Sequence, residues 1–313
     1  MPAHVTGAGK LVGLMHERWF DADGRWVHTV DWEPVEPRPG SVPVVLIHGL
    51  GASTLSWELV AGDLAARLGT RVTALDLPGF GRSRAESPAT MSSHRAAVTA
   101  LLRAQGPAIV MGNSMGGATS VGVAARHPEL VHALVLVNTA FPRPGANLDQ
   151  LARTARYAAL TLPSVAAPIV RARAQRLGPE RLVDTTLGLV FSERERIDPA
   201  LRERLVALAV ERRAYPEAAR SYTESGGSLF RYLTSGMRAD LDAVRAPTLV
   251  MHGRRDRLVP VSFARAVAER RPEWRYVELA DCGHAPQLEL PARFVDIVSR
   301  WADRELPDPA ARA

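Results

Sequence analysis

The chain has 313 residues, of which 46% are hydrophobic and 23% charged, enough apolar material for one large core or for a core with an inserted subdomain. Its single cysteine, Cys282, excludes an intrachain disulfide, and no run of about 18 apolar residues could form a transmembrane helix. The first 20 residues lack the apolar core of a signal peptide, so we expect a soluble, cytoplasmic protein without stable membrane insertion.

The net charge of +6 is concentrated in one segment of the chain. Residues 141–240 contain 16 Arg against 11 Asp and Glu, whereas the remainder contains 23 basic against 22 acidic residues. Acidic residues are interleaved with the arginines, as in SERERIDPALRER at 192–204. This pattern is typical of a solvated helix surface with ion pairs, so we expect no nucleic-acid partner.

Buried strands and helices alternate in the first half of the sequence. Residues 18–32 alternate apolar and polar types around Asp23-Gly24, which predicts an antiparallel hairpin. Continuous apolar runs then predict strands at 42–47, 71–77, 108–112 and 133–138, with helices at 59–68, at 93–104 and before His127-Pro128. This alternation predicts an α/β fold with a mostly parallel sheet and helices on both faces.

A helical insertion interrupts the sheet. Residues 141–240 are Arg-rich and Ala-rich, and they contain seven prolines that suit the boundaries of short helices. Within them, Leu201, Leu205 and Leu208 recur at helical spacing, and we expect the face that they form to be buried or to line a pocket. Strand patterns resume at 248–252 and 274–280, before an amphipathic helix at 294–301. We therefore expect a core domain of residues 17–140 and 241–306, with residues 141–240 as the insertion.

The pentapeptide GNSMG at 112–116 places Ser114 on a corner between a strand and a helix. Gly112 and Gly116 let the backbone turn sharply and let strand and helix approach closely, so the serine hydroxyl is exposed at the carboxyl end of the strand. A serine attacks only when a base removes its proton and a third group holds that base in one tautomer. Two loops supply such groups after the insertion, with Asp256 following one strand and His284 following the next.

The chain resembles the α/β-hydrolase superfamily from about residue 19 to residue 306. Motifs in the family's order carry the resemblance: VVLIHGLGAS for the oxyanion loop, LDLPGFGRS, GNSMGG for the nucleophile elbow, HGRRDRLVP for the acid loop and CGHAPQLELP for the histidine loop. The resemblance implies an α/β-hydrolase fold in which residues 141–240 form a helical cap, or lid, over the nucleophile.

The family's roles carry over to matching positions. Ser114 is expected to be the nucleophile, His284 the general base and Asp256 the carboxylate that orients His284. The backbone N–H groups of Leu50 and Met115 match the oxyanion hole. GNSMGGA is also similar to the elbow of carbon–carbon bond hydrolases that cleave ring-fission products, and Asn113, which belongs to that likeness, is expected to bind substrate. The chain departs from those enzymes in its oxyanion loop, HGLGAS, and in Ala285 after the histidine, where they often have Trp.

Other polar residues have more ordinary explanations. Asp76 could compete as the triad acid, but it precedes a turn whose glycines and Ser83 it could hydrogen-bond. His48 is expected to shape the oxyanion loop, His252 to pack or to bind backbone groups, and His127 to stabilise a helix end. Cys282 is expected to be a small buried hydrophobe.

We therefore expect a serine hydrolase that cleaves a small or medium apolar carboxylic ester through an acyl-serine intermediate. Alternatives are a carbon–carbon bond hydrolase of ring-fission-type diketones, peroxyacid formation, and a ligand-binding member of the fold without turnover. No metal-ligand spacing and no dinucleotide motif occurs, so we expect no metal and no cofactor. The expected partner is a small apolar substrate, and the expected assembly a monomer or homodimer.

Overall fold

A computed structural model describes residues 5–6, 10–11, 14–144 and 163–306. The strands are β1 Val5–Thr6, β2 Lys10–Leu11, β3 Met15–Asp21, β4 Trp26–Trp32, β5 Val44–Ile47, β6 Val72–Leu75, β7 Ala108–Asn113, β8 Val131–Val137, β9 Thr248–Gly253 and β10 Arg275–Leu279. The helices are α1 Glu58–Leu68, α2 Met91–Gln105, α3 Met115–Arg126, α5 Pro163–Val190, α6 Pro199–Glu211, α7 Ala218–Ser235, α8 Met237–Ala243, α9 Val261–Arg270, α10 Pro286–Glu289 and α11 Pro291–Glu305. A short 3-10 helix, η1, spans Thr54–Trp57.

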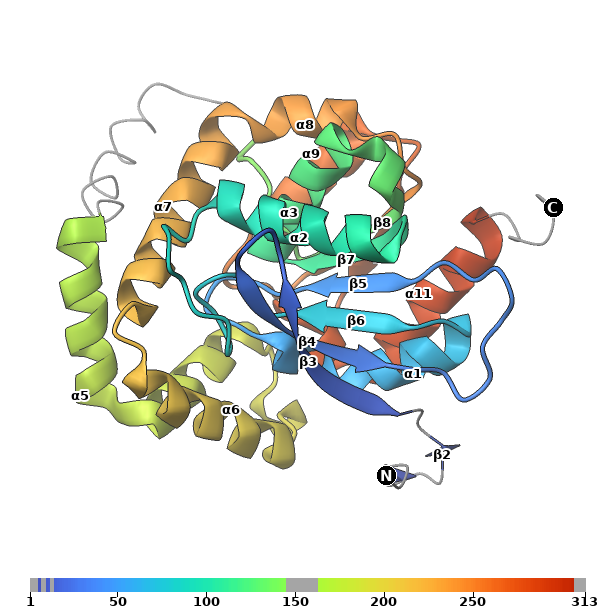
Figure 1. Ribbon diagram of the computed structural model, residues 1–313. Helices are drawn as coiled ribbons and strands as arrows, with labels where there is room; N and C mark the ends of the chain where they lie inside the picture. Colours follow the sequence, from blue (N-terminus) through green and yellow to red (C-terminus); the bar gives the residue numbers. More distant parts are fainter. Residues whose placement is uncertain (1–4, 7–9, 12–13, 145–162, 307–313) are drawn as a thin grey trace.

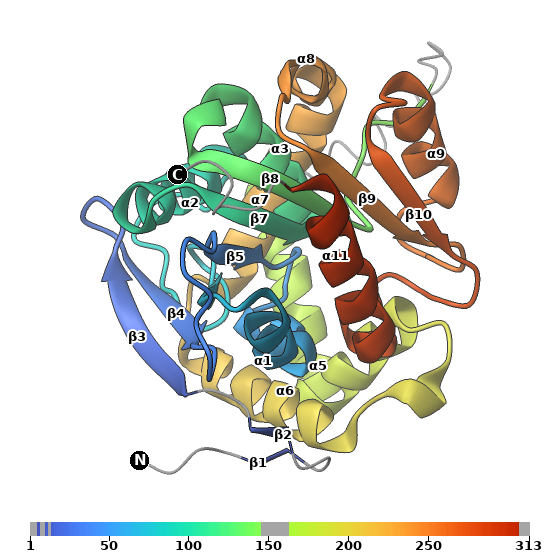
Figure 2. The same cartoon turned by 90° about the vertical axis from the view of Figure 1, so that its right-hand side faces the viewer.

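The main sheet has eight strands in the order β10-β9-β8-β7-β5-β6-β4-β3. Strands β10 to β6 are parallel, whereas β4 pairs antiparallel with β6 and with β3. Figure 2 shows the sheet from β3 at one edge to β10 at the other. The hairpin, the mostly parallel sheet and the helix positions predicted from the sequence are confirmed, with boundaries that differ by a few residues.

Helices cover both faces of the sheet (Figure 1). One core cluster joins the sheet to α2, α3, α8 and α9, and a second joins its other face to α1 and α11. Every residue of β5, β6, β7 and β9 is buried. Burial on both faces explains why these strands have continuous apolar runs in place of an apolar–polar alternation.

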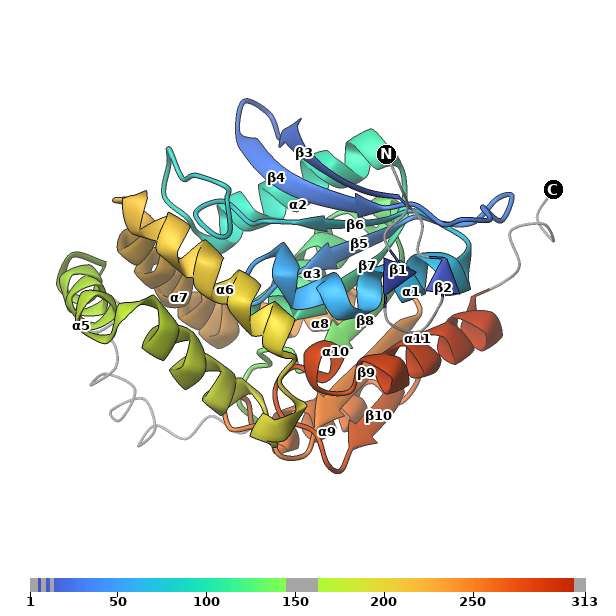
Figure 3. The same ribbon diagram turned by 90° about the horizontal axis from the view of Figure 1, so that it is seen from below.

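The helices α5, α6 and α7 lie between β8 and β9 in the chain and stand beside the carboxyl ends of the parallel strands (Figures 1 and 3). In α5, Gly178 has non-helical dihedral angles (φ 72°, ψ 167°) and separates two helical pieces, whereas Pro168 lies inside the first piece and ends no helix. The division of the chain at residues 140 and 241 stays a prediction, and α8 runs across the second position. No helix in the described ranges has the length and hydropathy needed to span a membrane.

The apolar face predicted on α6 is buried at Leu201 and only partly buried at Leu205 and Leu208. Leu201 is fully buried, and Leu205 packs in the same cluster as Val183 of α5 and Leu288 of α10. These two leucines therefore contribute to the contact between the helical insertion and the rest of the fold.

The start of α3 packs against the end of β5 so closely that only glycine fits at position 116. A Cβ atom there would lie 2.1 Å from the carbonyl oxygen of Ile47 and 2.6 Å from that of His48. We expect Gly116→Ala to lower the free energy of unfolding by about 1–3 kcal/mol or more, because helix and strand must separate. Urea denaturation monitored by circular dichroism measures the change.

Gly226→Ala in α7 is the matched control. A Cβ atom at Gly226 would meet only Leu50 Cδ2, at an ordinary contact distance of 3.7 Å. Alanine in a helix interior is expected to be neutral or to stabilise the protein by up to about 1 kcal/mol. Equal destabilisation by both substitutions would contradict the close approach of α3 and β5.

Candidate active site

Ser114 occupies a strained corner between β7 and α3. Its backbone has φ 56° and ψ −116°, a region that residues with side chains rarely adopt. The surrounding backbone holds this conformation: Ser114 N donates to Val137 O at 3.0 Å, and Ala140 N donates to Ser114 O at 3.2 Å. The serine is thus fixed at the carboxyl end of the sheet and immediately before the first turn of a helix, as the sequence predicts.

The two segments that are predicted to form the oxyanion hole flank Ser114. Met115 is the first residue of α3, and Leu50 follows β5. A Cβ atom on Gly49 would lie 3.1 Å from Ser114 Cβ, so the loop that carries Leu50 passes directly beside Ser114. This placement is compatible with two N–H donors near Ser114, and their role in stabilising an oxyanion stays a prediction.

His284 and Asp256 form a direct pair. His284 Nδ1 lies 2.7 Å from Asp256 Oδ2, and both side chains are buried. Because a carboxylate only accepts hydrogen bonds, Nδ1 carries the proton and Nε2 is left as the acceptor, which is the tautomer that a general base for serine needs. The sequence prediction that these two loops converge therefore agrees with the geometry.

The environment of Asp256 favours its ionised form. Burial alone would raise the pKa of this carboxyl, but hydrogen bonds from His252 and His284 outweigh burial and hold its pKa well below the ordinary value. Asn138 Nδ2 also donates to Asp256 Oδ2 at 2.8 Å, and Oδ1 accepts from the backbone N–H groups of Leu258 and Val259. A carboxylate held in this way can stabilise an imidazolium without taking its proton.

Ser114 and His284 come from neighbouring segments. Asn113, one residue before Ser114, donates from Nδ2 to the backbone oxygens of both His284 and Val137, each at 3.1 Å. Its amide thus joins the elbow to the histidine loop, while the predicted contact of Asn113 with substrate stays a prediction. The hydrogen bond between the Ser114 hydroxyl and His284 Nε2 also stays a prediction.

Asn138 has a role that the sequence did not reveal. It follows β8 with φ 43°, donates to Asp256 and to Gly283 O, and accepts from Gly253 N. One amide therefore joins the acid loop and the histidine loop. The only signal in the sequence is its position at a strand end beside the elbow strand, which does not distinguish it from any turn-forming asparagine.

Asp76 belongs to a separate polar network. Its carboxylate accepts from His28 Nδ1 at 2.8 Å, from Thr54 N at 2.7 Å and from Arg82 N at 2.9 Å, and its own backbone oxygen accepts from Ser83 Oγ. These bonds hold the turn after β6 to β4 and to η1. The interpretation of Asp76 as a residue that organises a turn agrees with these contacts.

His48 and His252 also bind backbone groups. His48 Nε2 accepts from Leu77 N at 3.0 Å, so Nδ1 carries the proton and donates to Gly49 O at 2.7 Å, and burial lowers the pKa of this imidazole. His252 Nε2 lies 3.0 Å from Val259 O and 3.4 Å from Asp256 Oδ2. His48 therefore holds the loop after β5 to the turn after β6, and the role of that loop in an oxyanion hole stays a prediction. His252 adds a donor beside the acid loop.

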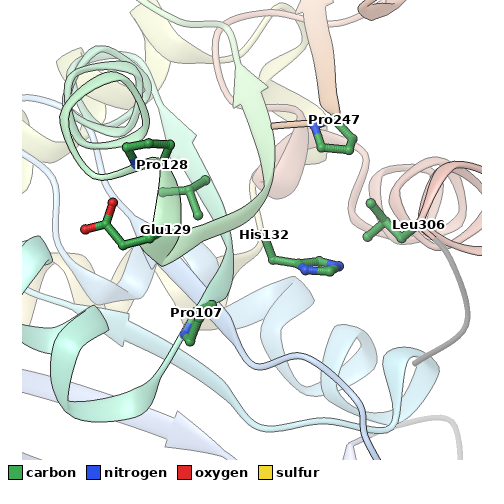
Figure 4. Close-up of a pocket in the computed structure, with 7 residues that line it drawn as sticks. Pro107, Pro128, Glu129, His132, Pro247 and Leu306 are labelled. Atoms are coloured by element: carbon green, nitrogen blue, oxygen red, sulfur yellow. The ribbon is translucent and has the colours of Figure 1, made fainter. Parts of the chain in front are cut away.

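A hollow lies away from this arrangement. Its volume is about 360 Å³, and it opens near the amino end of β8, lined by Pro107, Glu129, His132 and Leu306 among others (Figure 4), whereas Ser114, Asp256 and His284 follow carboxyl ends of strands.

Cys282, in the histidine loop, is buried, and burial raises the pKa of its thiol. In the described residues, no group of three or more His, Cys, Asp or Glu side chains is placed to hold a metal ion.

The chain is similar to known hydrolases over most of its length. A family profile described as alpha/beta hydrolase fold matches residues 42–291. A 2-hydroxy-6-oxo-6-(2'-aminophenyl)hexa-2,4-dienoic acid hydrolase of Metapseudomonas resinovorans is 30% identical over 92% of this chain and 92% of its own length. A pimeloyl-[acyl-carrier protein] methyl ester esterase of Aromatoleum aromaticum is 32% identical over 79% of this chain and 93% of its own.

Among solved structures, a serine hydrolase involved in carbazole degradation (CarC enzyme) superposes with a TM-score of 0.67 at 25% identity. The match covers 93% of this chain and 99% of that one. The similarity thus includes both the sheet and the helical insertion.

Asp256→Asn tests the pairing of acid and base. The amide leaves the shape of the site intact but favours the wrong imidazole tautomer, so we expect turnover to fall by about 10⁴-fold. Steady-state kinetics on an activated ester measure the change. Asp76→Asn is the comparison: it is expected to lower stability and to reduce turnover per folded molecule by less than about tenfold. A larger loss of turnover in Asp76→Asn than in Asp256→Asn would contradict the assignment of Asp256 as the carboxylate that orients His284.

Proposed function

We propose that this chain, which belongs to the alpha/beta hydrolase fold family, cleaves a small or medium apolar carboxylic ester through an acyl intermediate on Ser114. That it is a serine hydrolase of this fold follows from the family match and the relatives, and the ester substrate is the proposal. The observation that carries the acyl-serine chemistry is the His284–Asp256 pair, 2.7 Å apart, in a loop that Asn113 joins to the strained serine elbow. The choice of an ester is supported by the esterase among the relatives.

The reaction follows from these positions. Ser114 Oγ attacks the ester carbonyl carbon while His284 Nε2 takes the hydroxyl proton, and Asp256 stabilises the resulting imidazolium. The negative oxygen of the tetrahedral intermediate accepts hydrogen bonds from the N–H groups of Leu50 and Met115, each worth on the order of 3 kcal/mol. His284 then gives the proton to the leaving alcohol. Water, activated by the same imidazole, releases the acid and restores the serine.

Apolar side chains near the nucleophile support an apolar substrate. Met115, which follows Ser114, packs in the apolar core, and the backbone N–H of Ala140, a buried residue, donates to Ser114 O. On the cap side, α7 covers the oxyanion loop: a Cβ atom on Gly51 would lie 3.0 Å from the Tyr222 ring, and Gly226 approaches Leu50. Acyl or alcohol groups held between these residues would bury apolar surface, which is favourable by about 25 cal/mol per Å².

Carbon–carbon bond hydrolysis is the second candidate. It is favoured by the Metapseudomonas relative, which matches 92% of both chains, and by the GNSMGG elbow. The side chain at position 285 differs from the bulky residue expected for that activity: Ala285 is buried in the cluster between α6 and α10. Both reactions use the same serine, histidine and aspartate, so only substrates separate them.

Fluorophosphonate labelling and p-nitrophenyl ester hydrolysis test the proposal. We expect stoichiometric labelling and a burst of p-nitrophenol with short and medium acyl chains, because the acyl-serine forms faster than water cleaves it. Ser114→Ala should remove the label and lower turnover by several orders of magnitude, at least about 10³-fold. Ser120→Ala is the matched control, since Ser120 is buried in α3 two turns away and binds Gly116 O.

Two results would redirect the proposal. A ring-fission dienoate consumed with a kcat/KM at least about 100-fold above that of every ester would favour the second candidate. A wild-type protein that neither reacts with fluorophosphonate nor turns over either substrate class, while it binds a ligand with the same affinity as Ser114→Ala, would indicate a binding protein.

A further inference from the structure

The carboxylate of Glu289 lies at the centre of a buried cluster between the histidine loop and the helical insertion. Glu289 is the last residue of α10, five residues after His284, and its side chain is fully buried. In Figure 3, α10 lies beside the connection between α5 and α6. We name Val190, the last residue of α5, together with residues 191–196 of the connection, the hinge segment.

The two oxygens of Glu289 bind different parts of the molecule. Oε2 accepts from Gly283 N at 2.7 Å, one residue before the catalytic histidine, and lies 3.6 Å from Cys282 Sγ. Oε1 accepts from Ser192 N at 3.0 Å, from Ser192 Oγ at 2.5 Å and from Glu193 N at 3.1 Å. One rigid carboxylate therefore fixes the histidine loop relative to the hinge segment.

A second connection runs beside the first. His284 N donates to Val190 O at 2.7 Å, and a Cβ atom on Gly283 would lie 2.4 Å from Val190 O and 2.7 Å from Ser192 N. The backbone on both sides of the Gly283–His284 peptide is thus in direct contact with the hinge segment. A shift of the hinge segment would therefore move the backbone that carries the imidazole.

The carboxylate of Glu289 makes it costly to separate the histidine loop from the hinge segment. Arg196 of the hinge segment lies 3.4 Å from Oε1 and also donates to Asp281 O at 2.6 Å, so the cation joins the same two elements. A buried carboxylate that loses its N–H donors has no water to replace them, which makes separation of the two elements costly.

We propose that Glu289 is a positioning residue: it holds His284 in place through Gly283 N and couples that position to the hinge segment of the cap. The Glu289 carboxylate binds Gly283 N and the hinge segment, whereas the imidazole is paired with Asp256, so Glu289 acts on His284 through the backbone. A ligand that moves the cap is then expected to shift His284 relative to Ser114. A ligand that fits beneath the cap is expected to leave the position of His284 unchanged. This inference rests on the proposed function of His284 as the base.

Glu289→Gln tests the proposal, because the amide keeps the size of the side chain but turns an N–H₂ group toward one of the two sets of N–H donors. We expect the rate of fluorophosphonate labelling and kcat to fall by about 10- to 100-fold, with KM changed by less than about threefold, since a small displacement of a catalytic group costs rate and not binding. Asp31→Asn, a buried carboxylate on β4 bound to Arg18 and Thr73, is the matched control.

A measurement without turnover separates this inference from the proposed function. The proton on His284 Nδ1 is expected to give a low-field ¹H NMR signal, identified by its loss in His284→Gln. Glu289→Gln should shift or broaden this signal, and Asp31→Asn should leave it unchanged. A wild-type protein with no serine reactivity would contradict the proposed function, while the NMR comparison would still test the positioning by Glu289.

Ser192→Ala provides a second variant if Glu289→Gln does not fold. It removes only the hydroxyl donor on the hinge segment, so we expect a smaller effect in the same direction, about three- to tenfold on the labelling rate. Unchanged labelling per folded molecule and an unchanged His284 signal in the variants that fold would overturn the proposal. Glu289 would then only fasten the cap to the core.

Discussion

The close approach of α3 to β5 and β7 is the constraint on which the candidate site depends. Gly112 and Gly116 leave no room for a Cβ atom, and a Cβ atom on Gly49 would already be in tight contact with Ser114. Because the chain must turn from strand to helix within this space, Ser114 adopts a positive φ at the carboxyl end of the central strand β7. The same turn places the N–H groups at the start of α3 beside the serine, where the helix dipole favours negative charge.

Side-chain amides and one carboxylate hold the histidine loop by its backbone. Asn113 binds His284 O, Asn138 binds Gly283 O, and Glu289 binds Gly283 N. Each of these groups is buried and is also bonded to another segment: Asn113 to β8 through Val137 O, Asn138 to the acid loop and Glu289 to the hinge segment. Buried polar networks of this kind tolerate little displacement, because a broken bond leaves an unsatisfied group out of reach of water. These contacts fix the backbone that carries the imidazole, and Asp256 binds the ring itself.

The two buried aspartates at strand ends form similar pairs with histidine in different parts of the fold. Asp76 and Asp256 both bind a histidine through Nδ1 and both have pKa values below the ordinary range, despite burial that alone would raise them. The two aspartates differ in where their histidine partners lie. His28 lies on β4, toward the antiparallel edge of the sheet, whereas His284 lies in a loop bonded to the elbow through Asn113.

The sequence by itself determined the alternation of strands and helices, the serine elbow and the chain order of Ser114, Asp256 and His284. These features can be predicted because each depends on residues close together in the sequence: a run of apolar residues for a buried strand, and glycines for a sharp turn. Only the tertiary structure decided which acid meets which histidine, and that Asn138 and Glu289 hold the loops. Apart from the bond between Glu289 and Gly283, six positions apart, those contacts join residues tens to more than a hundred positions apart. They depend on strand order and helix docking, which no local pattern of residues specifies.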